Sequence, residues 1–204
     1  MALANYADLL ASIAAWANKT DMTAVIPDFV AIAESRIARD LRLRQQITTG
    51  TLTTSTSTRA VALPADWLEF SNVVIDGDPS TSCQFVATEY LNARFPDESY
   101  AGRPFFYSIE GDSVLFGPMP DDDYTVNIDY FARFPDLATS STNWLLTNHP
   151  NVYLYACLRE AFLYMFGDER AARWDALYAQ SVKDAQKFDD SATHSGSALR
   201  VRTL

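Results

Sequence analysis

Apolar residues recur at every third or fourth position at both ends of the chain, which is the spacing of an amphipathic helix. Two such stripes cover residues 4–18 and 26–41, and two more lie between Pro150 and Phe188. Pro27 and Pro150 suit the first turn of a helix, because the N–H that proline lacks has no partner there. The pattern therefore predicts two helices near each end.

Between these stripes the period changes to that of β-strands. From Ile47 onward the chain is rich in threonine and other β-branched residues, which favour strands. Val126, Ile128 and Tyr130 alternate with polar residues, as in a half-buried strand. Turns containing Asp and Gly separate the strands, and we expect one short helix among them. The order predicts an α+β fold, in which the N- and C-terminal helices form one bundle and an antiparallel β lobe is inserted between them.

These changes of period divide the chain into four parts. Residues 1–46 supply the N-terminal helices of the bundle, residues 47–136 form the β lobe with its short helix, and residues 137–190 supply the C-terminal helices. Residues 191–204 are mostly small and polar and lack the apolar density of a core. We therefore expect them to form a flexible tail.

Charge is unevenly distributed along the 204 residues. The formal net charge is −10, and residues 76–136 alone hold 12 acidic and 3 basic side chains. Such an acidic protein repels the phosphate backbone, which argues against a general nucleic-acid binder. The longest apolar run, residues 152–158, is much shorter than the roughly 18 residues of a membrane span, so we expect no membrane partner.

The residues that most often carry catalysis are few and poorly placed. His149 precedes Pro150 at a predicted helix start, which favours a loop or capping role. Cys157 lies among apolar residues of a predicted helix, as a core thiol does, and with Cys83 it forms neither a metal-ligand pair nor a disulfide framework. No phosphate-binding loop is evident among the 7 glycines. We therefore expect no enzyme and no cofactor.

Three neighbouring carboxylates, those of Asp121, Asp122 and Asp123, are the best candidate for a metal site. Grouped carboxylates can hold a hard cation such as Ca²⁺ or Mg²⁺. Their spacing lacks the alternation and the distal glutamate of an EF-hand loop. A solvated turn between strands is therefore the favoured interpretation, and we predict no metal site.

A group of arginines lies on and just after the second predicted helix. Arg36, Arg39, Arg42 and Arg44 lie off its apolar stripe, and Arg36 can pair with Asp40 one turn later. Acidic residues in the same region offset their charge. We therefore favour a solvated or intersubunit face over a nucleic-acid patch.

Aromatic residues are frequent in the predicted β lobe. Core packing accounts for most of them, and the remainder fit a ligand cleft or a subunit interface. They are Phe105, Phe106, Tyr107, Phe116, Tyr124, Tyr130, Phe131 and Phe134.

Five segments carry a pattern that extends over almost the whole chain. They are residues 5–44 (NYADLLASIAAWANKTDMTAVIPDFVAIAESRIARDLRLR), 58–70 (TRAVALPADWLEF), 102–135 (GRPFFYSIEGDSVLFGPMPDDDYTVNIDYFARFP), 143–161 (NWLLTNHPNVYLYACLREA) and 195–202 (SGSALRVR). In this order they resemble the head-to-tail adaptor (connector) proteins of tailed bacteriophages, especially those of short-tailed phages. The resemblance rests on the overall pattern and not on a catalytic signature.

The resemblance implies a structural virion protein that is assembled in the host cytoplasm and forms a ring, usually of about twelve copies. The ring would join the portal protein to a tail nozzle or tubular tail protein and continue the DNA channel. DNA would pass through it without specific binding.

The end of the chain alternates apolar and basic residues, as a strand does. Leu199 and Val201 alternate with Arg200 and Arg202, and such a segment can add to a sheet edge or lie in a groove. In the adaptors that the chain resembles, a C-terminal extension reaches toward the portal. The resemblance therefore assigns portal docking to these four residues.

Two other classes of function also fit the residues. The β lobe can be a binding module for a small ligand or a peptide, or residues 121–123 can serve a metal-dependent hydrolase. A saturable ligand without a ring would indicate the first class, and cation-dependent activity would indicate the second.

Overall fold

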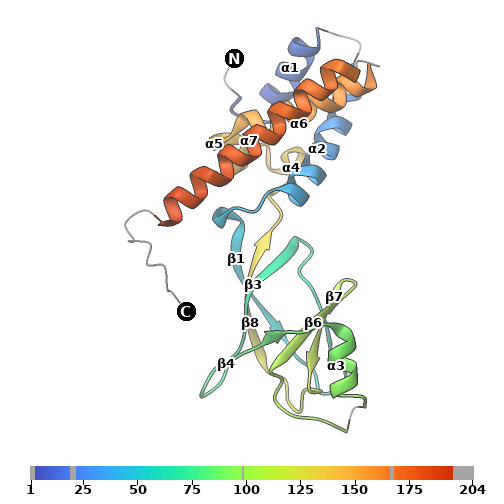
Figure 1. Cartoon of the computed structure of the whole chain (residues 1–204), viewed down its shortest axis with the longest axis vertical. Coiled ribbons are helices and arrows are strands. Elements are labelled where there is room, and N and C mark those ends of the chain that lie inside the picture. The colour runs from blue at the N-terminus through green and yellow to red at the C-terminus, as the bar shows by residue number, and fades with distance from the viewer. Residues whose placement is uncertain (1–2, 19–21, 98, 166–167, 195–204) are drawn as a thin grey trace, which may run out of the picture. The chain divides into compact units, whose positions relative to one another are not determined.

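The structure is a computed structural model that describes residues 3–18, 22–97, 99–165 and 168–194. The chain folds as two compact units, and Figure 1 labels most of their helices and strands. A helical unit comprises Met1–Gln45 and Phe134–Leu204, and a β unit comprises Gln46–Arg133. The α+β class predicted from the sequence is confirmed.

The helical unit is built around α6 (Pro150–Tyr164), which other helices cover on several sides. Those helices are α1 (Tyr6–Ala17), α2 (Ile26–Asp40), α5 (Trp144–Asn148) and α7 (Asp168–His194), and the short helix α4 (Leu137–Ser140) precedes α5. α6 packs against α1, α2, α5 and α7, and Figure 1 shows α7 lying along it. Its buried residues are Val152, Tyr153, Leu154, Ala156, Cys157, Leu158, Ala161 and Phe162. Because these residues occupy most of the helix circumference, α6 needs neighbours on nearly every side.

The short helices α4 and α5 lie ahead of Pro150, before the two apolar stripes that predicted the C-terminal helices. Asn143 caps α5, because its Oδ1 accepts a hydrogen bond from the Leu146 N–H at 2.9 Å. Its Nδ2 donates to the buried Tyr153 hydroxyl of α6 at 2.8 Å. Leu145 and Leu146 are fully buried. α5 is therefore ordered by contact with α6 as well as by its own cap.

The last helix is longer than predicted. α7 continues to His194, so the first four residues of the segment 191–204 are helical. Ser191 Oγ donates to the Lys187 carbonyl at 2.8 Å, which is a bond that serine makes inside helices. The remaining residues, 195–204, lie outside the described part of the chain.

The β unit consists of two four-stranded sheets, with strand orders β1-β8-β3-β4 and β2-β7-β6-β5. The strands are β1 (Ile47–Thr53), β2 (Ala60–Ala62), β3 (Trp67–Ile75), β4 (Thr81–Ser82), β5 (Gln84–Phe85), β6 (Phe106–Glu110), β7 (Ser113–Gly117) and β8 (Thr125–Ala132). The short 3₁₀ turn η1 (Arg44–Gln46) precedes β1. All neighbouring strands are antiparallel except β5 and β6, which run parallel where the sequence predicted an antiparallel lobe.

The two sheets share one apolar core. Val126, Ile128 and Tyr130, which the sequence placed on one face of a strand, are buried in it. Residues of β3 from the first sheet and of β7 from the second complete the cluster, and they include Val73, Ile75, Val114 and Phe116. The sheets therefore pack face to face.

α3 (Thr88–Arg94) covers the other face of the second sheet. Leu91 and Phe95 pack there against Leu115 of β7. Gly117, at the end of β7, permits this close approach. A Cβ atom built on Gly117 would lie 2.5 Å from Leu91 Cδ1 and 3.1 Å from Phe95 Cδ2.

We expect Gly117→Ala to lower the free energy of unfolding of the β unit by about 1–3 kcal/mol, because the added methyl group forces α3 away from the sheet. Urea denaturation followed by tryptophan fluorescence measures the loss. Gly102→Ala is the matched control, since the nearest atom to its new Cβ would be Pro118 Cγ at 3.6 Å. Equal stability of the two variants would contradict the tight contact at Gly117.

Candidate functional site

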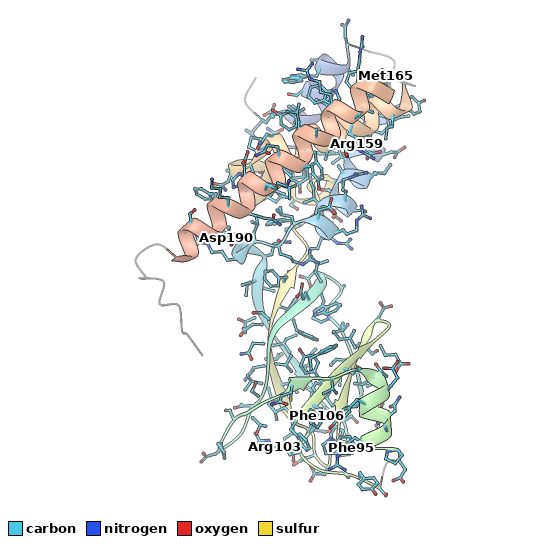
Figure 2. The ribbon with its side chains drawn as sticks, viewed as in Figure 1. Phe95, Arg103, Phe106, Arg159, Met165 and Asp190 are labelled. Atoms are coloured by element: carbon cyan, nitrogen blue, oxygen red, sulfur yellow. The ribbon has the colours of Figure 1, made fainter. Side chains whose placement is uncertain are left out.

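Two arginines and two carboxylates form a network that joins α2, α6 and α7. The Glu160 carboxylate accepts from Arg36 at 3.1 Å and from Arg159 at 2.6 Å. Asp175 Oδ1 lies 3.5 Å from Arg36 Nη1 and 2.7 Å from Arg159 Nε. Each carboxylate thus faces both cations, and the charges balance. Arg159, labelled in Figure 2, belongs to α6 and Asp175 to α7.

The other arginines of the predicted group have different surroundings. Arg42 donates to the carbonyls of Ala38 and Leu41 at 2.6 and 2.8 Å, where a cation is favourable at the C-terminal end of α2. Arg44 binds Asp189 of α7 twice, through its backbone N–H at 2.9 Å and its Nε at 3.0 Å.

The structure therefore does not place the four arginines on one exposed face. Arg36, Arg42 and Arg44 each bind atoms of their own helical unit, and Arg39 Nε lies 3.6 Å from Asp40 Oδ1. The Arg39 side chain is 72% exposed, compared with 20% for Arg36 and 45% for Arg44. The predicted intersubunit face stays a prediction, and Arg39 is the member of the group that is best placed to reach another molecule.

A pocket of about 290 Å³ lies in the β unit, and a second one of about 230 Å³ lies beside the ion network. The second is lined by Arg159, Leu163, Ala171, Ala172 and Asp175. Leu163, which lines this pocket, and the adjacent Tyr164 are exposed apolar residues at the end of α6. Apolar side chains beside a charge-balanced ion network are suited to packing against another polypeptide.

His149 is held as a structural residue between two helices. Its backbone N–H donates to the Leu145 carbonyl at 2.8 Å, and its own carbonyl accepts from Val152 at 3.0 Å. Its ring lies 5.5 Å from that of Trp144 and 5.7 Å from that of Phe188. Burial lowers the pKa of the imidazole, so the neutral form is favoured at pH 7.

The two cysteines are buried and free. Burial raises the pKa of the Cys157 thiol strongly, and the nearby Glu34 and Glu160 carboxylates raise it further. Burial raises the pKa of Cys83 to about 11, although Arg103 opposes the shift. Both residues are therefore thiols at neutral pH and poor nucleophiles.

The carboxylates of Asp121 and Asp122 accept hydrogen bonds within their own turn. Asp121 Oδ1 accepts from the Tyr124 hydroxyl at 2.7 Å, and Asp122 Oδ1 accepts from the Asp123 N–H at 2.8 Å. Arg103 lies over the Tyr124 ring at 5.9 Å and balances part of the charge. Within the described ranges, no group of three or more His, Cys, Asp or Glu residues is placed to hold a metal ion.

Some aromatic residues of the β unit form a continuous surface beside α3. Phe106 lies 4.6 Å from Phe105, 5.9 Å from Tyr90 and 6.5 Å from Phe95, measured between ring centroids. Phe95 and Phe106 are labelled in Figure 2. Tyr90 and Phe105 are exposed, whereas Phe116 and Tyr130 from the predicted set are buried in the core. The sequence did not indicate Tyr90 as part of this group, because Tyr90 lies on the short helix α3, among the strands of the β unit.

The larger pocket lies next to this aromatic surface. It is lined by Ser57, Thr58, Arg59, Phe95, Pro96, Asp97 and Met119. Arg59 is anchored there by bonds to the Phe95 carbonyl and to Asn92 Oδ1. Its guanidinium is therefore committed to positioning α3 on the sheet.

The two structural units differ in net charge. The β unit, residues 46–133, holds 13 acidic and 4 basic side chains, a net charge of −9. The helical unit holds 13 acidic and 12 basic side chains, a net charge of −1. The acidity that the sequence located in the middle of the chain is thus a property of one folded unit.

The predicted docking residues Leu199, Arg200, Val201 and Arg202 lie outside the described residues. Their role stays a prediction. None of the helices in the described part of the chain is long and apolar enough to cross a membrane.

Comparison with known proteins identifies one family. The sequence model of the SU10 adaptor protein family matches residues 4–202 of the chain. No curated protein was found to match it. The family match extends through both units, and it includes the arginines of α2, the acidic turn and the alternating residues near the C-terminus.

We expect Glu160→Gln to destabilise the helical unit by about 1–3 kcal/mol, because it removes one of the two carboxylates that face Arg36 and Arg159 in a partly buried site. Chemical denaturation measures the change. Arg39→Gln is the control, and it should shift the free energy of unfolding by less than about 0.5 kcal/mol, as exposed charges do. If Glu160→Gln were as stable as the control, the network would not hold the three helices together.

Proposed function

Because the chain belongs to the SU10 adaptor protein family, we propose that it forms a ring that joins the portal vertex of a phage capsid to the tail. A phage adaptor protein is a structural protein of the virion. The observation that carries the proposal is the family match over residues 4–202, which includes both folded units. The role is non-enzymatic, and its chemistry is that of contact between proteins.

The helical unit has the features of a subunit that contacts others. A closed ring needs two different lateral surfaces on each copy, and about twelve copies would complete it. Arg39 is strongly exposed on α2, while Leu163 and Tyr164 are exposed at the end of α6. The charges of the partly buried network are already balanced within the chain. Ring contacts can therefore form here without leaving a buried charge unpaired.

The charge of the β unit suits a channel component. Its net charge of −9 repels DNA wherever the two approach within a Debye length of about 8 Å at physiological salt. Repulsion of this kind lets DNA pass without adhering. Specific DNA binding is therefore no part of the proposed role.

The C-terminal segment supplies the contact with the portal protein. Leu199 and Val201 give a strand-like apolar side, and Arg200 and Arg202 give a basic one. Such a segment docks through its backbone, while its side chains set register and charge complementarity. The other partner is a nozzle or tubular protein of the tail.

Mass measurement of the purified protein with and without portal rings tests the proposal. We expect the portal particle to gain about twelve copies, while the protein alone forms no such ring. Bovine serum albumin in place of the portal is the control for nonspecific association. The same stable dimer in both mixtures would overturn the proposed ring.

Truncation at Ser195 tests the docking segment. Because α7 ends at His194, removal of residues 195–204 leaves every described element in place, and the melting temperature should not change. Attachment to the portal should be lost. A full-length Arg200→Ala, Arg202→Ala variant separates the contribution of charge from that of the backbone. A truncated protein that still binds portal rings with wild-type affinity would show that the segment is dispensable.

A further inference from the structure

β1 is an edge strand with one open side. It pairs with β8 along all of its residues, from Ile47 opposite Phe131 to Thr53 opposite Thr125. It stands at the end of the sheet order, and in the described part of the chain no other strand pairs with it. Five of its seven residues are exposed, and Gly50 and Leu52 are half-buried.

The ladder identifies which backbone groups face outward. Thr54 N–H donates to the Tyr124 carbonyl at 3.0 Å, and antiparallel pairs alternate between bonded and non-bonded. The Thr125 carbonyl accepts from Asp76 N–H at 2.8 Å, so it points to β3 and away from Thr53, as the alternation requires. Thr48, Gly50 and Leu52 thus bond to β8. The outward N–H and C=O groups belong to Ile47, Thr49, Thr51 and Thr53.

This edge lacks the features that usually protect an open strand. Proteins cover such edges, shorten them, or place lysine, proline or a bulge on them. β1 has seven residues, contains neither a charged residue nor a proline, and pairs with β8 in unbroken register. An extended segment of another polypeptide can therefore add to it.

The surroundings of the edge select a basic segment. Asp129 lies on the outer face of the sheet, where its carboxylate accepts from Thr49 Oγ1 at 2.9 Å. The acidic turn adjoins the end of the strand, because Thr54 Oγ1 donates to the Asp122 carbonyl at 3.0 Å. Lysine or arginine at alternate positions of an added strand would lie on the same face as Thr49, Thr51 and Thr53, within reach of these carboxylates.

We propose that the free edge of β1 binds an extended basic segment of the tail component, which adds to the sheet as a further strand. The inference rests on the proposed function and names the surface that the tail partner uses. Backbone hydrogen bonds supply the affinity, and the acidic surroundings supply the selectivity.

The folded part of a second copy of the chain is poorly suited to pair with the free edge of β1. Its other edge strands, β2, β4 and β5, have only three, two and two residues. Pairing of β1 with the β1 of another copy is two-fold symmetric and gives a closed dimer instead of a ring. The C-terminal segment of a second copy is assigned above to the portal.

Amide hydrogen exchange with single-residue resolution tests the proposal in three samples: the free protein, the protein on portal rings, and the same complex with the tail component added. We expect exchange at Thr49, Thr51 and Thr53 to slow at least about tenfold in the third sample only. Thr48, Gly50 and Leu52 are internal controls and should exchange slowly throughout.

Each other outcome overturns the proposal. Unchanged exchange in the third sample would show that no strand adds to β1. Protection already present on portal rings, or in the free protein, would show that another copy or the chain itself covers the edge. If rings fail to form on the portal, the proposed function fails first, so the two failures are distinguishable.

A pair of substitutions at Thr51 gives an independent test. Thr51→Pro removes an outward N–H that the ladder with β8 does not use, as proline at an edge strand permits. Thr51→Val keeps the N–H and the β-branched shape. We expect proline, and not valine, to weaken retention of the tail component at least about tenfold, with melting temperatures confirming that both variants are folded. A folded proline variant that retains the tail component at the wild-type level would overturn the proposal. Should that variant not fold, the exchange measurement decides.

Discussion

Burial of α6 is the requirement on which the helical unit depends. A helix that is apolar around most of its circumference cannot face water on any broad side, so helices from both ends of the chain must assemble around it. α1 and α2 come from one end, and α5 and α7 from the other. The ninety or so residues between them are consequently free to form a separate unit, which joins the bundle at Gln45 and Phe134.

Polar contacts then fix the arrangement of the helices that apolar packing alone leaves adjustable. Glu160 projects from α6 toward Arg36 of α2 and Arg159, and Asn143 ties α5 to Tyr153 of α6. These groups are only partly exposed or fully buried, so a slipped helix would leave an unpaired charge or amide behind. Apolar burial brings the helices together, and these contacts select one register.

The local sequence pattern was sufficient to predict the main elements of the fold, because these elements depend only on the period of the apolar residues. The main helices and the inward face of β8 follow from spacings of 3.6 and 2 residues. Contacts between residues that are far apart in the sequence do not follow from these spacings. Arg36 and Glu160 are far apart in the chain, and nothing in their neighbours indicates that they meet. The same holds for the parallel pairing of β5 with β6 and for the edge position of β1, since both are properties of strand order. The longer α7 was missed because its last turn has little apolar content.

The two hydrogen bonds from Arg44 to the Asp189 carboxylate make the end of α7 a mechanical link to the segment before β1. Asp189 holds both the backbone and the guanidinium of a residue that lies just ahead of β1. Tension applied to the C-terminus therefore travels along α7 to one carboxylate and passes into the backbone that leads to the first strand. A molecule strained between two attachments would load this pair of parallel hydrogen bonds, which lie close to the strand that leads into the β unit.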